Sequence, residues 1–364
     1  MTGSTLGVEE EFHLVDPTTG ALAASSAVAD AAVRGEAGPH VQPEISTTQL
    51  ETATGVCRTL DEVRAALVAT RLEAVAAAQT DGLTVLAAST HPTAAVSDLV
   101  LTDAPRYRAM VQRWAGLALG QDICGTHVHV GVDSLDVAVG VMDRARPYLP
   151  LLLAMTGSSP FHTGADTGHE SWRTVWWSRW PVSGPPEPMG DADGYRAVIA
   201  SLVGTGMVPD GSQVYWDLRP STHVPTVEFR MGDVCTDPDD AVLHAALCRS
   251  LVSTLAGRLD TPAPVVRPEL LRAARWHAAR HGLGGQLVDP LTGTRVHAAD
   301  AVRALLAELR EDLDSRGELA EVTALAEQLL ARGTSAARQR RVLAEDGDPG
   351  AVVRDLLRVG RTAV

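Results

Sequence analysis

Three consecutive glutamates, Glu9 to Glu11, interrupt a strand-like apolar run near the start of the chain. Successive side chains of a strand point to opposite faces, so Glu9 and Glu11 share one face while Glu10 lies on the apolar face. Two carboxylates about 4–5 Å apart repel by about 4 kcal/mol at the effective dielectric near a protein surface. A solvated strand face would tolerate this pair, whereas a cleft would require a cation. Because hard oxygen ligands suit Mg²⁺ or Mn²⁺, a divalent-cation site is the functional alternative.

Two histidines follow the same alternation in the middle of the chain, in the segment Cys124–Val132. His127 and His129 lie on one face of this predicted strand, and a row of valines marks the opposite, buried face. Histidines two residues apart on a strand are typical of metal ligands, of nucleotide contacts or of hydrogen-bonded polar residues. The segment by itself leaves these three possibilities open.

Two further segments carry acids in suggestive positions. In the strand-like segment Thr226–Met231, Glu228 and Arg230 lie opposite three apolar side chains, where a surface ion pair is the plain alternative. Glu44 and Glu51 are seven residues apart in a segment whose composition favours an extended chain with a bend, so their joint geometry is undetermined. Each of these two glutamates could equally be solvated.

Together, the four segments predict a sheet with one face packed on helices and the other lining a polar cleft. Five carboxylates with histidine and arginine in one cleft imply several divalent ions. Such a site suits phosphoryl transfer, in which metal ions bridge nucleotide phosphates to carboxylates and arginine stabilises the transferred charge.

The composition excludes several other chemistries. The 364-residue chain contains no lysine, so every one of its 31 basic residues is arginine. Pyridoxal-phosphate enzymes, Schiff-base aldolases, Walker-type phosphate loops and protein kinases all require a lysine. A net charge of −14 argues against nucleic-acid and anionic-membrane partners. Four scattered cysteines and the absence of a signal-like N-terminus or a long apolar span predict a cytoplasmic protein.

The elements that must position these residues alternate between strand and helix through the first two thirds of the chain. Thr59 has the spacing of a helix cap and opens a predicted helix to about Thr80, and a second helical stretch is expected from Pro92 to about Leu119. Residues 157–192 are rich in Gly, Pro, Ser and Trp and predict a long ordered loop. From about residue 268 the pattern is nearly all helical. The absence of repeats and linkers predicts one catalytic domain spanning residues 1–364.

Seven motifs in order then resemble one family, the YbdK-type carboxylate–amine ligases, also called glutamate–cysteine ligase type 2. The likeness spans about residues 6 to 290. The motifs are Gly7–Phe12, Pro43–Thr54, Thr90–Pro92, Cys124–Val132, Asp166–Gly168, Trp216–Ser221 and Thr226–Asp233. Several multi-residue motifs in register are more specific than any one of them.

The resemblance implies an α+β, glutamine-synthetase-like fold, with a curved, mainly antiparallel sheet around the site and helices behind it. It implies an ATP- and Mg²⁺-dependent ligase, with Mn²⁺ as a possible substitute. In such an enzyme a carboxylate, typically the γ-carboxylate of glutamate, attacks ATP to give an acyl phosphate, and the amine of cysteine or a related compound then displaces phosphate. Small-molecule substrates are therefore the expected partners, and the family suggests a homodimer.

The resemblance also assigns residues. The implied metal ligands are Glu9, Glu11, Glu44, Glu51, His127 and Glu228. Glu228 and Arg230 are expected to act in catalysis, with Arg230 contacting the transferred phosphate. His129, Arg230 and Arg280 are expected beside the nucleotide, although a solvated basic face is the alternative for Arg280.

Two other functions remain open from the sequence. A metal-dependent, amidohydrolase-like hydrolase would use the His127-x-His129 pair, but such enzymes carry this motif early in the chain. A catalytically idle binding protein would retain the fold without the reaction. The arginine that binds a substrate carboxylate is also open among Arg173, Arg179 and Arg219.

Overall fold

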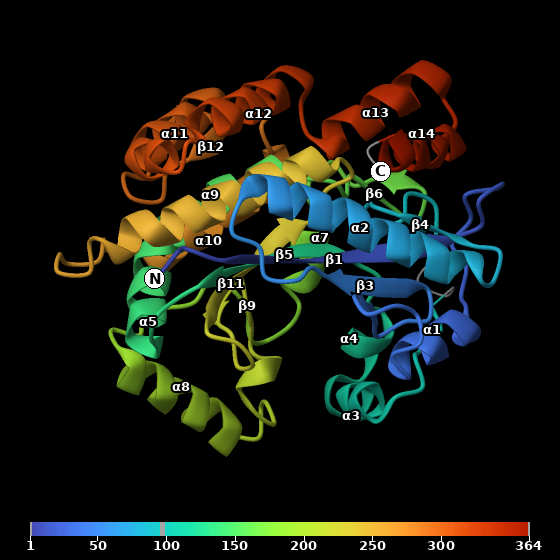
Figure 1. Cartoon of the computed structure of the whole chain (residues 1–364), viewed down its shortest axis with the longest axis horizontal. Coiled ribbons are helices and arrows are strands. Elements are labelled where there is room, and N and C mark those ends of the chain that lie inside the picture. Colours follow the sequence, from blue (N-terminus) through green and yellow to red (C-terminus); the bar gives the residue numbers. More distant parts are fainter. Residues whose placement is uncertain (1, 95–98, 363–364) are drawn as a thin grey trace.

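The computed structural model describes residues 2–94 and 99–362. Within these residues a seven-stranded antiparallel sheet has the order β10-β11-β5-β1-β3-β2, and β4 pairs with β1 (Figure 1). Its strands are β1 (Leu6–Val15), β2 (Val41–Pro43), β3 (Gln49–Ala53), β4 (Thr84–Leu86), β5 (Gly125–Gly131), β10 (Leu218–Pro220) and β11 (Thr226–Asp233). The four segments predicted to carry the site are therefore neighbours in one sheet.

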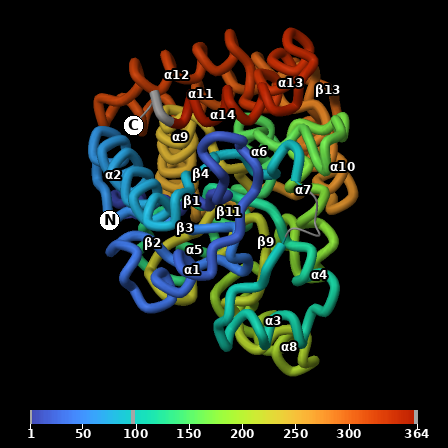
Figure 2. Tube along the Cα trace, turned by 90° about the vertical axis from the view of Figure 1, so that its right-hand side faces the viewer, coloured from blue at the N-terminus to red at the C-terminus, as the bar shows by residue number. Residues whose placement is uncertain are grey.

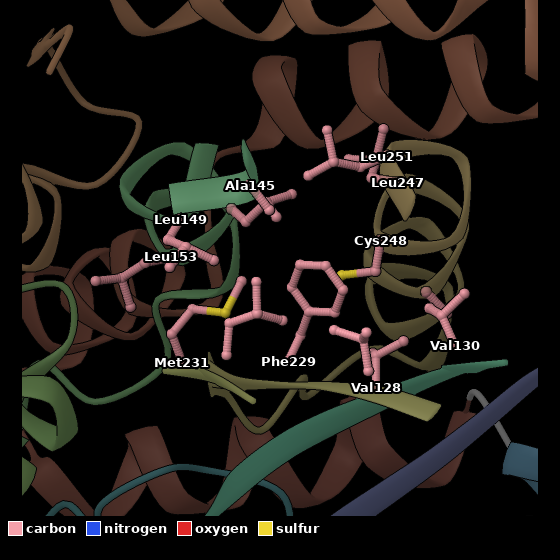
Figure 3. Packing of buried hydrophobic residues seen from close by; sticks show 14 of the residues in the cluster. Val128, Val130, Ala145, Leu149, Leu153, Phe229, Met231, Leu247, Cys248 and Leu251 are labelled. Atoms are coloured by element: carbon pink, nitrogen blue, oxygen red, sulfur yellow. The ribbon is translucent and has the colours of Figure 1, made fainter. Parts of the chain in front are cut away.

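One face of this sheet packs on helices, as the alternation of apolar residues predicts. Val128 and Phe229 point towards α9 (Pro238–Ala256), and Met231 lies near α6 (Leu149–Thr156), as Figure 3 shows. Asp237 caps α9 and Pro238 follows at its first position, a combination that favours a helix start. Helix α9 is buried along most of its length because further helices cover its outer side.

Those outer helices include α2 and two of the C-terminal helices. Helix α2 (Leu60–Gln79) starts at the predicted cap, where Thr59 Oγ1 accepts from Glu62 N at 3.2 Å. The predicted C-terminal helices are α10 (Pro268–His281), α11 (Ala298–Ser315), α12 (Leu319–Arg332), α13 (Ser335–Asp346) and α14 (Pro349–Thr362). The sequence pattern missed a short hairpin between α10 and α11, β12 (Gln286–Val288) with β13 (Arg295–His297).

On the other face of the sheet, α3 (Pro105–Trp114) contributes to the lining of the cleft, and the short α4 (Gly116–Leu119) follows it. Helix α1 (Ser26–Val33) packs against β2, β3 and α2, whereas α5 (Leu135–Ala145) packs against α9 and β10, and α8 (Ala192–Gly204) packs against α5. Helices α3 and α8 both lie at the end of the molecule far from the C-terminal helices (Figure 2). Arg113 Nη1 donates to Gly206 O at 2.6 Å, which connects the ends of these two helices. The polar cleft lies on this side of the sheet.

Two predicted elements differ from the structure. The helix expected from Pro92 begins at Pro105, because residues 100–102 are extended and bond to residues 45–47; residues 95–98 of that prediction lie outside the described residues. The loop predicted at 157–192 contains short elements, which are β6 (Phe161–His162), β7 (Ala165–Asp166), α7 (Trp172–Trp177) and β8 (Ser183–Gly184). Elements this short are set by tertiary contacts, and β8 pairs with the distant strand β9 (Tyr215–Trp216). Among the described residues, no helix has both the length and the apolar character needed to cross a bilayer.

Candidate active site

Strand register brings the predicted residues into rows across the sheet. Glu11 of β1 lies opposite Glu51 of β3, and Glu9 lies opposite His127 of β5. On the far side of β5, His129 lies opposite Glu228 of β11. Cross-strand partners point to the same face, so the acids and histidines line one surface.

Potential metal-ligand atoms converge at three places on this surface among the described residues. Within each group the atoms lie within 4.8 Å of one another. The groups are Glu9 with His129 and Glu228, Glu9 with Glu51 and His127, and Glu11 with Glu44 and Glu51. All six residues predicted as ligands occur in these groups, and His129, which was predicted beside the nucleotide, is a seventh.

Glu9 is shared by two groups and is held by both histidines. His127 Nδ1 lies 3.1 Å from Glu9 Oε2, and His129 Nε2 lies 3.2 Å from Glu9 Oε1. Burial alone would raise the pKa of Glu9, but the hydrogen bonds to His127 and His129 hold the pKa of this carboxyl well below its usual range. Glu9 is therefore an ionised ligand before any cation binds.

Glu228 is also held ionised, by two arginines. Arg219 Nε lies 2.8 Å from Glu228 Oε2, and Arg230 forms an ion pair with Oε1. Burial would raise the pKa of Glu228, yet these two guanidinium groups lower it well below its usual range. The sequence pattern left a surface ion pair with Arg230 as an alternative, whereas the observed pair is buried at Glu228, and the pattern gave no sign of the pairing with Arg219.

The third group has too little positive charge nearby. Burial and the Glu44 carboxylate raise the pKa of Glu11 to about 8, and burial together with Glu9, Glu44 and Glu11 raises the pKa of Glu51 well above its usual value. Burial likewise raises the pKa of Glu44. Within the described part of the chain, neither Glu44 nor Glu51 has an arginine at ion-pair distance. Three half-buried carboxylates with raised pKa values are a donor set that could hold a divalent cation.

The two histidines differ in their environment. Burial and the Arg230 charge lower the pKa of His127 to about 4, so this imidazole is neutral and able to ligate a metal at neutral pH. Burial lowers the pKa of His129 less than Glu9 and Glu228 raise it, so the net pKa shift is upward. His129 Nδ1 lies 2.9 Å from Thr226 Oγ1, which fixes the ring orientation.

Glu10 lies on the opposite face, as the alternation predicts. Arg71 of α2 donates to both of its carboxylate oxygens, at 2.8 and 2.6 Å, and both side chains are almost fully buried. Arg71 also donates to the carbonyl oxygens of Cys235 and Thr236. Glu10 therefore joins β1 to α2 and takes no part in the cleft.

A polar cavity of about 120 Å³ adjoins the Glu11 end of the acidic row. Its charged walls include Arg106, Arg173 and Arg230, and its aromatic walls include Trp177, Trp180 and Tyr215. Arg173 was one of three predicted candidates for a substrate carboxylate. Sequence reasoning missed Arg106, which follows the first residue of α3 and carries no local signal of function.

The other predicted arginines have different places. Arg219 is engaged with Glu228, and the Arg179 guanidinium stacks 3.5 Å from the Trp176 ring centre, outside the cavity. Arg280 of α10 donates to Gly168 O and lies against the 166–169 loop, so the structure does not bring it to the acidic row. Its predicted nucleotide role stays a prediction.

Comparison with known proteins identifies the relatives of this chain. The model of glutamate-cysteine ligase family 2 matches residues 5–355. A protein of Nocardia farcinica that carries the name glutamate–cysteine ligase 2-1 is 41% identical over 98% of this chain and 93% of its own length. Both matches extend over nearly the whole chain and include every segment of the site.

Solved structures share the fold at low sequence identity. A glutamate–cysteine ligase of Francisella tularensis, solved in complex with AMP, matches with a TM-score of 0.71 at 14% identity, over 100% of this chain and 89% of that one. A bifunctional glutathione synthetase of Pasteurella multocida also gives 0.71, at 16% identity; the match covers 99% of this chain and 52% of that protein, so this chain spans about half of its length. The predicted α+β fold of glutamine-synthetase-like ligases is confirmed.

Proposed function

This chain belongs to glutamate–cysteine ligase family 2, and from that premise we propose how it joins a carboxylate to an amine with ATP. The carboxylate attacks the γ-phosphorus of ATP, which releases ADP and leaves an acyl phosphate. The amine nitrogen then attacks the acyl carbon, phosphate departs, and the nitrogen loses a proton to give the amide. The names of the relatives indicate glutamate as the acid and cysteine as the amine.

The observation that carries this proposal is the unbalanced group Glu11, Glu44 and Glu51. Three half-buried carboxylates with raised pKa values offer oxygens that lie within 4.8 Å of one another. Their all-oxygen donor set fits a hard divalent cation such as Mg²⁺ or Mn²⁺. A hydrolase that uses a histidine pair does not need such a group, so the donor chemistry favours phosphoryl transfer.

We assign the three groups as divalent-cation ligands. Glu9, His129 and Glu228 form one cation position, and Glu9, Glu51 and His127 form the next. Glu9 therefore belongs to two neighbouring positions. Bound divalent ions would supply charge neutralisation for the phosphates and for the transferred phosphoryl group. In this arrangement His129 contributes a ligand at the end of the row near Thr226, next to the expected nucleotide.

Arg230 lies between the acidic row and the cavity. Its guanidinium is paired with Glu228, and burial lowers its pKa less than Glu228 and Glu9 raise it, so it remains charged. A fixed arginine at this boundary is suited to stabilise the charge of the transferred phosphoryl group. Glu228 holds that guanidinium in place, which accounts for the predicted catalytic role of both residues.

The cavity is suited to amino-acid substrates. Arg173 is buried, and the hydrogen bonds of its guanidinium within the described residues are long, to Met231 O at 3.4 Å and to Arg230 O at 3.3 Å. Arg106 lines the same cavity. Two guanidinium groups besides Arg230 can neutralise the carboxylates that an amino-acid acid and an amino-acid amine retain during the reaction. The aromatic wall of Trp177, Trp180 and Tyr215 excludes water from the acyl phosphate.

The test is to incubate the purified protein with ATP, Mg²⁺, glutamate and a panel of amines, and to follow ADP, phosphate and a new amide by mass spectrometry. One amide formed per ADP supports the ligase. Amide hydrolysis without ATP would support the amidohydrolase-like alternative, which the family match does not favour. If no ATP is consumed with glutamate and any of the amines, the acid and amine pair proposed here is wrong.

Glu51 provides a sharper variant because it belongs to two of the three groups. We expect Glu51→Gln to slow turnover by about 100-fold or more, since losing about 3 kcal/mol of transition-state stabilisation has that effect. Glu73→Gln is the matched control, because Glu73 is a half-buried glutamate beside a histidine, His40, but lies on α2 away from the cleft. Equal rates for Glu51→Gln and wild type would contradict the ligand assignment.

A further inference from the structure

A bulge in β11 places one more acid on the cleft-side face of the sheet. The pairing of β11 with β5 shifts register between Phe229 and Gly232, so an extra residue is accommodated there. After the shift Asp233 lies opposite Gly125, two residues before His127 on β5. A bulge changes which face the following side chains occupy. Without it, strict alternation would have placed Glu228 and Asp233, five residues apart, on opposite faces.

Both carboxylate oxygens of Asp233 accept hydrogen bonds from other residues of the chain. Its side chain is fully buried. Oδ2 accepts from Ser158 N at 2.9 Å and from Ser159 Oγ at 2.7 Å, and Oδ1 accepts from Ser171 Oγ at 2.7 Å. The carboxylate thus clamps two segments of the 157–192 region, and it belongs to none of the three ligand groups found among the described residues.

Two of these serines, Ser159 and Ser171, also accept hydrogen bonds from the backbone at and beside Arg173. Ser159 Oγ accepts from Arg173 N at 3.0 Å. Ser171 is the N-cap of α7 and accepts from Thr174 N at 3.2 Å, so it fixes the start of the helix whose second residue is Arg173. The two segments also bond to each other, since Trp172 N donates to Ser159 O at 3.0 Å.

The sheet leaves room for the arginine at this place. Arg173 lies directly over Gly125, the cross-strand partner of Asp233, and a Cβ on that glycine would overlap the guanidinium. The guanidinium therefore depends on the backbone of β5 on one side and on the anchored start of α7 on the other. Its own bonds to Met231 O and Arg230 O are long.

We infer that Asp233 is a positioning residue for substrate binding: through Ser159 and Ser171 it fixes the start of α7 and so holds Arg173 in the cavity. The inference rests on the proposed function for the role of Arg173 in binding a substrate carboxylate. The geometric part, that Asp233 orders residues 171–174, stands independently of which substrate is bound.

The kinetic test compares Asp233→Asn with Asp143→Asn. Asp143 is a matched control, because it is a buried aspartate that accepts from the backbone N–H groups of Met189 and Gly190 and, among the described residues, forms no hydrogen bond with residues 171–174. We expect Asp233→Asn to raise KM for the amino-acid substrate bound by Arg173 about tenfold or more, with KM for ATP within about twofold of wild type. An equal rise for Asp143→Asn, or a rise in KM for ATP as large as that for the amino acid, would overturn the inference.

A double-mutant cycle identifies the route of the effect. If Asp233 acts through Arg173, Asp233→Asn should add less than about twofold to KM in an Arg173→Met background. Additive effects of the two changes would show that Asp233 acts elsewhere.

Hydrogen–deuterium exchange separates failure of this inference from failure of the proposed function. In Asp233→Asn the amides of residues 171–174 should exchange about tenfold or more faster, while Asp143→Asn leaves them as in wild type. Unchanged exchange overturns the inference even where the ligase is active. Faster exchange in a protein without ligase activity would support the positioning role and refute the proposed function alone.

Discussion

At the scale of single residues, the carboxylates of the acidic row differ in how well neighbouring positive groups compensate their charge. At one end Glu9 and Glu228 have pKa values lowered by histidines and arginines, and at the other end Glu11, Glu44 and Glu51 have pKa values raised by burial and by one another. The first end is already compensated by protein groups. The second end has to gain a proton or a cation.

This difference predicts proton release on metal binding. Because the pKa of Glu11 is raised to about 8, its carboxyl holds a proton at pH 7, and a divalent cation must displace it. We expect titration with Mn²⁺ to release at least about one proton per protein at pH 7, and metal affinity to increase as pH rises towards about 8. Calorimetry in buffers of different ionisation enthalpy measures this number. Glu11→Gln should reduce the release and Glu73→Gln should not; identical release from Glu11→Gln and wild type would contradict the prediction.

At the scale of elements, the site depends on what neighbouring strands allow. Strand β5 supplies His127 and His129 to the row and, at Gly125, an open surface for Arg173. Gly125 N also donates to Glu11 Oε2 at 2.6 Å. Gly125 therefore has two roles: its N–H binds a carboxylate of the acidic row, and its lack of a side chain leaves space for Arg173 at the cavity.

A methyl group at this position should disturb the cavity more than the row. In Gly125→Ala the new Cβ would occupy the place of the Arg173 guanidinium, and overpacking of this kind costs about 1–3 kcal/mol. We expect KM for the amino-acid substrate to rise about tenfold, with a smaller change in Mn²⁺ affinity measured by calorimetry. Gly55→Ala is the control, because a Cβ there meets no atom of the described residues within 4 Å. A Gly125→Ala enzyme with wild-type KM would show that Arg173 is not confined as described.

At the scale of the whole molecule, the C-terminal helices hold the loop that carries the cavity wall. Arg340 of α13 donates to both carboxylate oxygens of Asp166 at 2.9 Å and to Glu170 Oε1 at 2.5 Å. Thr334 Oγ1 donates to Glu170 Oε2 at 2.5 Å, and Gln339 Nε2 donates to Ser158 O at 2.8 Å. The last third of the chain thus reaches the same segment that Asp233 anchors from the sheet.

Removing this connection should loosen the loop. We expect Arg340→Ala to lower the free energy of unfolding by about 1–2 kcal/mol, because the pair with Glu170 is partly buried while Asp166 is exposed. Exchange of residues 161–171 should accelerate in the same variant. Arg303→Ala is the matched control, since Arg303 forms a comparable two-bond pair with Glu327 on the surface of the C-terminal helices. Equal exchange of the loop in both variants would contradict this role of Arg340.

Much of the fold and site could be predicted because the relevant signals are local. Alternation selected Glu9 and Glu11 and set Glu10 apart, and the cap residue Thr59 placed a helix start correctly. The absence of lysine narrowed the chemistry before any element was assigned. The predicted extent of the helix before Leu119 and the prediction of a loop over 157–192 were wrong, because contacts with distant segments determine the structure there.

The sequence by itself determined which side chains could face a cleft, since the two-residue period of a strand is a property of the chain alone. Tertiary structure decided which strands are neighbours, and therefore that His129 joins Glu9 and Glu228. It also decided that Arg106 and Arg173 meet at one cavity and that a bulge brings Asp233 to the cleft-side face. These features depend on register and packing between segments far apart in the chain, whose free energies no local pattern contains.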